Sequence, residues 1–213
     1  MRVFIFGDSI TQGFFDLGGG WAQRLIKDYH VKTLEGLHSN GPWIEVFNLG
    51  VSGDTTQGVI DRMDNEIEAR ELSEGDKAIV VAIGCNDSIL RDNRVMVEEY
   101  EFESRVEELV DTALEHTSKV LLVGLAPVDQ RQTDPWVHSS SGKQWKNNRI
   151  DLFEDILKQV AGRKKVSFVP IYDSMKAKQD EGIKLHSDGL HPNDEGHRLI
   201  YEAVKPKLEE LIK

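Results

Sequence analysis

The chain has 213 residues and carries 26 basic and 37 acidic side chains, a net charge of −11. This length suits one domain, residues 1–213, which can bury a core without disulfide or metal cross-links. The acidic balance argues against nucleic acid and anionic membrane surfaces as partners, since both attract basic proteins.

Cysteine content and the first residues indicate a cellular compartment. The single cysteine, Cys85, cannot form an internal disulfide, which favours a reducing environment. The start MRVFIFGDS has an apolar run of only four residues, too short for a signal peptide. No stretch approaches the roughly 18 apolar residues that span a bilayer. We therefore predict a cytoplasmic protein, although a chain that had lost its signal peptide would look the same.

Five short apolar runs alternate with longer segments of helical spacing. The runs cover residues 2–6, 43–50, 77–84, 119–127 and 166–172, and the helical segments cover 20–29, 55–70, 97–116, 146–161 and 194–212. This alternation predicts an α/β fold, with a parallel sheet and helices on both of its faces.

Some details of these segments can also be predicted. Asp54 is expected to cap the helix over 55–70, with Gln57 reaching back from the third helical position. Pro206 should kink or restart the last helix, because proline has no N–H to donate. Residues 128–145 form the longest irregular segment, and such a loop is usually functional or disordered. Gly18–Gly20 is interpreted as a flexible approach to the first helix rather than a phosphate-binding loop.

Polar residues follow the first three predicted strands. Ser9, Gly53 and Asn86 lie at or just beyond these ends, and the carboxyl ends of parallel strands meet at one edge of a sheet, where ligands bind. Asp188 and His191, three residues apart, directly precede the last helix. Acyl transfer needs a nucleophile, a base and a group that orients the base, and Ser9, His191 and Asp188 can supply these in turn.

The same strand ends can supply hydrogen-bond donors to a developing oxyanion. The candidates are the N–H groups of Ser9 and Gly53 and the side-chain amide of Asn86. Taken singly, each of these residues is an ordinary turn or cap residue, and His191 alone is an ordinary loop histidine. Their combination, in four separate blocks with complementary roles, favours catalysis.

These four blocks, GDSIT (7–11), NLGVSGD (48–54), GCND (84–87) and DGLHP (188–192), resemble those of the SGNH hydrolases, or GDSL esterases, in the family's order. The resemblance implies a single three-layer α/β/α domain, flavodoxin-like, with five parallel strands in the order 2-1-3-4-5. It also implies Ser9 as nucleophile, Gly53 and Asn86 as oxyanion donors, and Asp188 and His191 as the rest of the triad. Ile10 departs from the family name, which has Leu there.

We therefore predict a serine ester hydrolase that needs no metal or cofactor and acts on small-molecule esters with acetyl or short acyl groups, possible targets including acetylated carbohydrate. Thioesterase, lysophospholipase and acyltransferase activities use the same triad, and a catalytically silent binding module would use the same cleft. Trp136 and Trp145 are candidates for contact with a sugar ring or acyl chain, although Trp145 could equally anchor a helix. His197 is expected to be solvated. The oligomeric state stays open.

Overall fold

A five-stranded parallel sheet forms the centre of the computed structural model, which describes residues 1–37, 41–71 and 75–213. Its strands lie in the spatial order β2-β1-β3-β6-β8, and every neighbouring pair is parallel. Counted along the chain as the first to fifth strands of this sheet, they have the order 2-1-3-4-5, which confirms the predicted topology. The strands are β1 (Arg2–Gly7), β2 (Glu45–Gly50), β3 (Lys77–Ala82), β6 (Val120–Val123) and β8 (Ser167–Val169).

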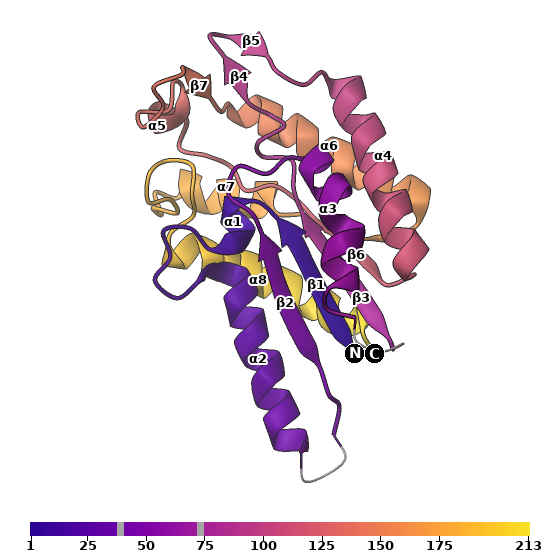
Figure 1. Ribbon diagram of the computed structural model, residues 1–213. Helices are drawn as coiled ribbons and strands as arrows, with labels where there is room; N and C mark the ends of the chain where they lie inside the picture. Colours follow the sequence, from indigo (N-terminus) through magenta and orange to yellow (C-terminus); the bar gives the residue numbers. More distant parts are fainter. Residues whose placement is uncertain (38–40, 72–74) are drawn as a thin grey trace.

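Helices cover both faces of this sheet (Figure 1). One face packs against α2 (Gly20–Gly36) and α8 (Asp194–Leu211), and the other against α3 (Thr56–Glu68), α4 (Glu99–His116) and α6 (Asn147–Lys164). Along β1, Val3 and Ile5 pack into the core on the side of α2 and α8. Phe4 and Phe6 pack into the core on the side of α3, α4 and α6. A strand that is buried on both faces has no polar side, which explains its continuous apolar run.

The segment 128–145 is more ordered than its composition indicated. It contains a short helix, α5 (Gln130–Thr133), and the strand β7 (Lys143–Gln144). β7 completes a small antiparallel sheet with β4 (Leu90–Arg91) and β5 (Arg94–Val95), in the order β5-β4-β7. Strands of two residues are too short to show a hydrophobic period, so this sheet could not be predicted from the sequence.

The predicted cap of α3 was wrong, and at Pro206 one of the two predicted effects, a restart of the helix, is contradicted. The cap of α3 is Thr55, whose side chain accepts a hydrogen bond from the N–H of Gly58, and Asp54 instead accepts from the N–H of Thr55. The side chain of Gln57 bonds Asp61 rather than reaching back to the cap. α8 runs without interruption through Pro206, so the helix does not restart there.

The remaining helices are the one-turn α1 (Ser9–Gln12), directly after β1, and α7 (Tyr172–Asp180), which follows β8. Within residues 1–37, 41–71 and 75–213, none of the helices combines the length and the apolar character needed to cross a membrane.

Candidate active site

The carboxyl end of β1 turns sharply into α1 and places Ser9 at the first helical position. Asp8 caps this helix, because its Oδ1 accepts a hydrogen bond of 2.9 Å from the N–H of Ile10. Gly7 is required by close packing, since a Cβ there would lie 2.1 Å from the hydroxyl oxygen of Thr11. The tight turn therefore fixes the direction in which the Ser9 side chain points.

Ser9, His191 and Asp188 form a continuous hydrogen-bonded chain. Ser9 Oγ lies 3.0 Å from His191 Nε2, and His191 Nδ1 lies 2.8 Å from Asp188 Oδ2. All three residues are buried, with 7%, 5% and 7% of their surface exposed. With Nδ1 protonated and donating to Asp188, Nε2 is left free to accept the serine proton.

The loop before α8 holds the imidazole in this position. Asp188 Oδ1 accepts hydrogen bonds from the N–H groups of Leu190 at 3.0 Å and His191 at 2.7 Å. The carbonyl of His191 in turn accepts from the N–H of Ser187. Although burial opposes ionisation of Asp188, the hydrogen bonds and charge of His191 hold its pKa below the usual value. The carboxylate is therefore ionised when it orients the histidine.

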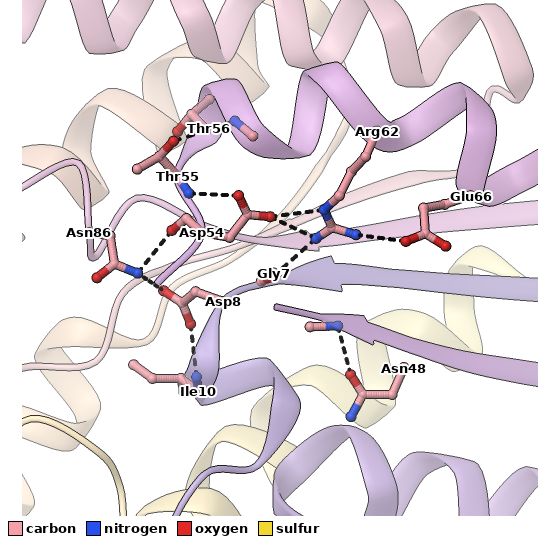
Figure 2. Close-up of polar contacts among 12 residues, drawn as sticks. Gly7, Asp8, Ile10, Asn48, Asp54, Thr55, Thr56, Arg62, Glu66 and Asn86 are labelled. Atoms are coloured by element: carbon pink, nitrogen blue, oxygen red, sulfur yellow. Dashed lines mark hydrogen bonds and ion pairs between the residues drawn. The ribbon is translucent and has the colours of Figure 1, made fainter. Parts of the chain in front are cut away.

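Asn86 joins the ends of β1 and β2 (Figure 2). Its Nδ2 donates to the carbonyl oxygen of Asp54 at 2.9 Å and, over a longer distance of 3.4 Å, to Asp8 Oδ2. Its two partners are the chain neighbours of Gly53 and Ser9. The N–H groups of Gly53 and Ser9 donate to no acceptor in the described part of the chain. Gly53 has a φ of 81°, a backbone conformation that favours glycine.

The five predicted site residues are thus gathered in two ways. Three of them, Ser9, Asp188 and His191, contact one another directly. Asn86 and Gly53 are tied to the serine turn through Asp8 and Asp54, the residues beside them in the network. Unpaired N–H groups next to the serine can receive an anionic oxygen.

An ion pair supports this network from α3. Arg62 donates to Asp54 Oδ2 at 2.9 Å and to the carbonyl of Gly7 at 3.3 Å, and it also contacts Glu66 (Figure 2). Asp8, which follows Gly7 in the serine turn, is almost fully buried, and burial raises the pKa of its carboxyl group to about 6. The serine turn and the loop that carries Gly53 are therefore fixed to the same guanidinium group.

Three aromatic rings lie near the histidine, and of these only Trp136 was a candidate from the sequence. The ring centroids of Phe14 and Phe15 lie 5.4 and 5.3 Å from that of His191, and that of Trp136 lies 6.2 Å away. Trp145 is buried and donates its Nε1–H to the carbonyl of Cys85, so it anchors the loop instead of facing a ligand.

His197 was predicted to be solvated, and this was wrong. The side chain is fully buried, and neither ring nitrogen has a hydrogen-bond partner among the residues that the structure describes. Burial lowers its pKa to about 4, so the ring is neutral near pH 7. Its ring lies close to Gly20, where an added Cβ would come within 3.2 Å of it.

Comparisons with known proteins identify a family for this chain. The GDSL-like lipase/acylhydrolase family matches residues 5–199. A GDSL esterase/lipase of Arabidopsis thaliana is 24% identical over 98% of this chain and 86% of its own length. The human isoamyl acetate-hydrolyzing esterase 1 homolog is 25% identical over 99% of this chain and 82% of its own.

Solved structures share the fold. A lipase/acylhydrolase from Enterococcus faecalis superposes with a TM-score of 0.72 at 21% identity, covering 98% of this chain and 95% of that one. Axe2, an acetyl xylan esterase from Geobacillus stearothermophilus, superposes with a TM-score of 0.71 at 19% identity, covering 97% and 94%. The match over residues 5–199 and the fold together place this chain in the GDSL-like lipase/acylhydrolase family of ester-hydrolysing enzymes.

Proposed function

We propose that the protein hydrolyses carboxylic esters of short acyl groups through an acyl-enzyme on Ser9. The observation that carries this proposal is the 3.0 Å contact between Ser9 Oγ and His191 Nε2, with Asp188 behind the ring at 2.8 Å. This arrangement makes the hydroxyl a nucleophile without a metal ion, because the imidazole accepts its proton as the new bond forms.

In the first half of the reaction, Ser9 Oγ attacks the ester carbonyl and its proton passes to His191 Nε2. The carbonyl oxygen becomes an oxyanion that accepts from the N–H groups of Ser9 and Gly53 and from the Asn86 amide. The carbon–oxygen bond to the alcohol then breaks, and the leaving oxygen takes the proton from Nε2. An acyl group remains on Ser9.

In the second half, water replaces the alcohol. His191 Nε2 accepts one proton from the water as its oxygen attacks the acyl carbon. The tetrahedral intermediate collapses, Ser9 Oγ takes the proton back, and the carboxylic acid is released. Acyl transfer differs only in that a second alcohol takes the place of water.

Acetate esters are the substrates that we propose first. Relatives named for isoamyl acetate and for acetyl xylan differ in the alcohol but share the acetyl group. The composition of residues 128–145 also favours short acyl groups, because this long segment is polar and has no run of leucine or phenylalanine that would form an apolar lid. The alcohol that leaves can then be an alkyl alcohol or a carbohydrate hydroxyl group.

A fluorophosphonate probe and two serine variants test the nucleophile. We expect the probe to label Ser9 covalently, and Ser9→Ala to lose labelling and at least about 10³-fold in kcat/KM for a short p-nitrophenyl ester. Ser118→Ala is the matched control, because Ser118 is exposed and lies before β6, at the opposite end of the strands. Full activity in Ser9→Ala would refute the proposal, and a wild type that neither labels nor hydrolyses would indicate a binding module.

A further inference from the structure

Two phenylalanines beside the histidine are exposed although they are large and apolar. Phe14 has 42% and Phe15 has 56% of its surface exposed, and their ring centroids lie 4.5 Å apart. Both rings lie against the imidazole of His191, at 5.4 and 5.3 Å. Exposed aromatic side chains that meet at a reactive group are typical of a ligand-binding surface rather than of a core.

The loop that carries these rings is held in shape before any ligand arrives. Asp16, within it, accepts from the N–H groups of Gly18 at 2.9 Å and Gly20 at 3.1 Å, and pairs with Arg24 at 3.3 Å. The N–H of Phe14 donates to the carbonyl of Ser9 at 3.0 Å, so the loop is also fixed to the nucleophile. A surface that is rigid when empty loses little entropy on binding.

The backbone of Phe15 adds an independent observation. Its φ is 65°, in the left-handed region that non-glycine residues seldom adopt. Glycine would occupy this position without strain, so a phenylalanine here has an unfavourable backbone conformation together with an exposed ring. Such a combination indicates that the ring itself is needed.

The proton transfer by His191 indicates which part of the substrate lies beside these rings. During catalysis the leaving oxygen must come within about 3 Å of His191 Nε2 to receive its proton. The amide of Asn86, one of the proposed oxyanion donors, is held by Asp8 and Asp54, whereas the two phenyl rings lie against the imidazole. The first carbon atoms of the alcohol, and not those of the acyl group, therefore lie beside the rings that flank the imidazole.

We propose that Phe14 and Phe15 form the leaving-group subsite and that it takes an apolar alkyl or aryl alcohol. This inference rests on the proposed esterase function and names its alcohol. The two phenyl rings offer hydrocarbon surface and no hydrogen-bond donors, so they favour methylene groups over the hydroxyl groups of a sugar. The ring centroid of Trp136, 6.2 Å from that of His191, adds a third aromatic ring near the imidazole.

A series of acetate esters tests this subsite. Ethyl, butyl, 3-methylbutyl and hexyl acetate share one acyl group and alcohols of similar acidity, so their rates differ through contacts of the alcohol. Release of acetate gives kcat/KM for each ester and for an acetylated methyl pyranoside. We expect kcat/KM to rise up to about fourfold per methylene and the pyranoside to be the poorest substrate.

Two variants test whether the rings cause the increase of kcat/KM with alcohol length. Phe14→Ala and Phe15→Gly should flatten the dependence of kcat/KM on alcohol length, so that the loss of kcat/KM grows from ethyl to hexyl acetate. Glycine is chosen at 15 because it keeps the left-handed backbone, and Phe14→Leu should restore part of the slope. Leu17→Ala is the matched control: Leu17 lies in the same loop and is fully exposed, so the dependence of kcat/KM on alcohol length should equal that of the wild type.

The outcomes separate this inference from the proposed function. A wild type that releases acetate equally from all the alkyl esters, or fastest from the pyranoside, overturns the subsite but leaves the esterase intact. If the variants instead flatten the dependence on acyl length, from ethyl acetate to ethyl hexanoate, the rings contact the acyl group and the inference is wrong. No hydrolysis of any ester would contradict the esterase itself. Thermal melting of each variant checks that it is folded.

Discussion

In the proposed mechanism, the side chain of Asn86 has to change its hydrogen-bond partners during the reaction. Its amide Nδ2 already donates to the Asp54 carbonyl at 2.9 Å and to Asp8 at the longer distance of 3.4 Å. The longer bond is the weaker one, so the N–H that makes it can turn to an oxyanion at small cost. Asn86 is therefore expected to bind the transition state more strongly than the substrate.

Removing this amide should slow the chemical step. We expect Asn86→Ala to lower kcat by about 10²- to 10³-fold for a short p-nitrophenyl ester, while KM changes little. Steady-state kinetics on the purified variant measures both constants. Asn65→Ala, at an exposed position of α3, serves as control. A higher KM at unchanged kcat would show that the amide binds substrate without stabilising the oxyanion.

The residues that sequence reasoning found and missed differ in one physical respect. Ser9, Asn86, Asp188 and His191 were identifiable because polar residues at strand and helix ends stand out from the apolar runs beside them. Phe14 and Phe15 were missed, because an apolar side chain shows no local sign that it is exposed. For His197 a signal existed: it shares the helical spacing of Ile200, Val204 and Leu208, which marks the buried face of α8.

At the scale of elements, the start of α3 is fixed to the end of β1. Arg62 bonds Asp54 and the carbonyl of Gly7, and its side chain also lies over the ring of Phe6, 5.3 Å from the centroid. Asp54 and Arg62 are only 10% and 18% exposed at their side chains. Breaking a pair this buried leaves an uncompensated charge, which the loop can relieve only by moving.

We expect the loss of this pair to disturb the oxyanion donors. Arg62→Met keeps the apolar stem over Phe6 and should lower kcat by about tenfold with a smaller change in KM, because about an ångström of misplacement weakens transition-state contacts. Arg62→Lys should recover part of kcat, since lysine can still pair with Asp54. Arg70→Met removes an ion pair with Glu66 on the same helix and is the control. Equal losses in both methionine variants would point to destabilised α3 instead.

Glu154 connects α6 to the ends of two strands. Its carboxylate accepts from the N–H groups of Leu125 at 2.6 Å, Ile171 at 3.2 Å and Tyr172 at 3.0 Å. Burial raises its pKa to about 7, and the three N–H donors, which favour the charged form, offset only part of that effect. The folded protein therefore holds a proton on Glu154 up to about neutral pH, whereas the unfolded chain releases it near pH 4.5.

The sign of the resulting pH dependence follows from this raised pKa. The contribution of Glu154 to stability is complete below pH 4.5 and is lost as the pH rises through about 7. Relative to Glu154→Gln, which does not titrate, the wild type should lose up to about 3 kcal/mol of unfolding free energy between pH 4.5 and 8. Urea unfolding of both proteins across this range measures the difference. A constant difference would show that Glu154 does not titrate there.

The elements themselves were predictable to different degrees. All five central strands and the five long helices followed from periodicity, because each has a buried face and enough residues to show it. The cap of α3 is Thr55, one residue later than predicted, because the carboxylate of Asp54 accepts a hydrogen bond from Arg62, further along the same helix. That competition depends on the folded arrangement, and spacing alone could not reveal it.

On the scale of the whole molecule, the sheet divides the core into two clusters of buried residues. One cluster joins β1 and β3 to α3, α4 and α6, and the other joins them to α2 and α8. Because every central strand contributes to a continuous sheet between the two layers, neither layer can be exposed without uncovering that sheet. If residues 1–213 form the predicted single domain, we therefore expect the whole of it to unfold cooperatively.

Unfolding should take place in one step. We expect urea transitions followed by tryptophan fluorescence and by far-ultraviolet circular dichroism to coincide, as they do for a two-state domain. Leu208→Ala, at a fully buried position of α8, should lower the unfolding free energy by about 2–5 kcal/mol in both signals. Leu34→Ala, at a position of α2 that is 63% exposed, should change it by less than about 0.5 kcal/mol. Two separate transitions would contradict the single domain.

The hydrogen bond between Ser9 and His191 joins residues that are 182 positions apart. During synthesis, the strand that carries Ser9 leaves the ribosome first, and ribosomes add about 5–20 residues per second. The imidazole is translated many seconds later, with the loop before the last helix. A nascent or prematurely terminated chain that lacks this loop would display a serine without its base, so any hydrolysis that depends on this contact can begin only after the loop that carries His191 has been translated.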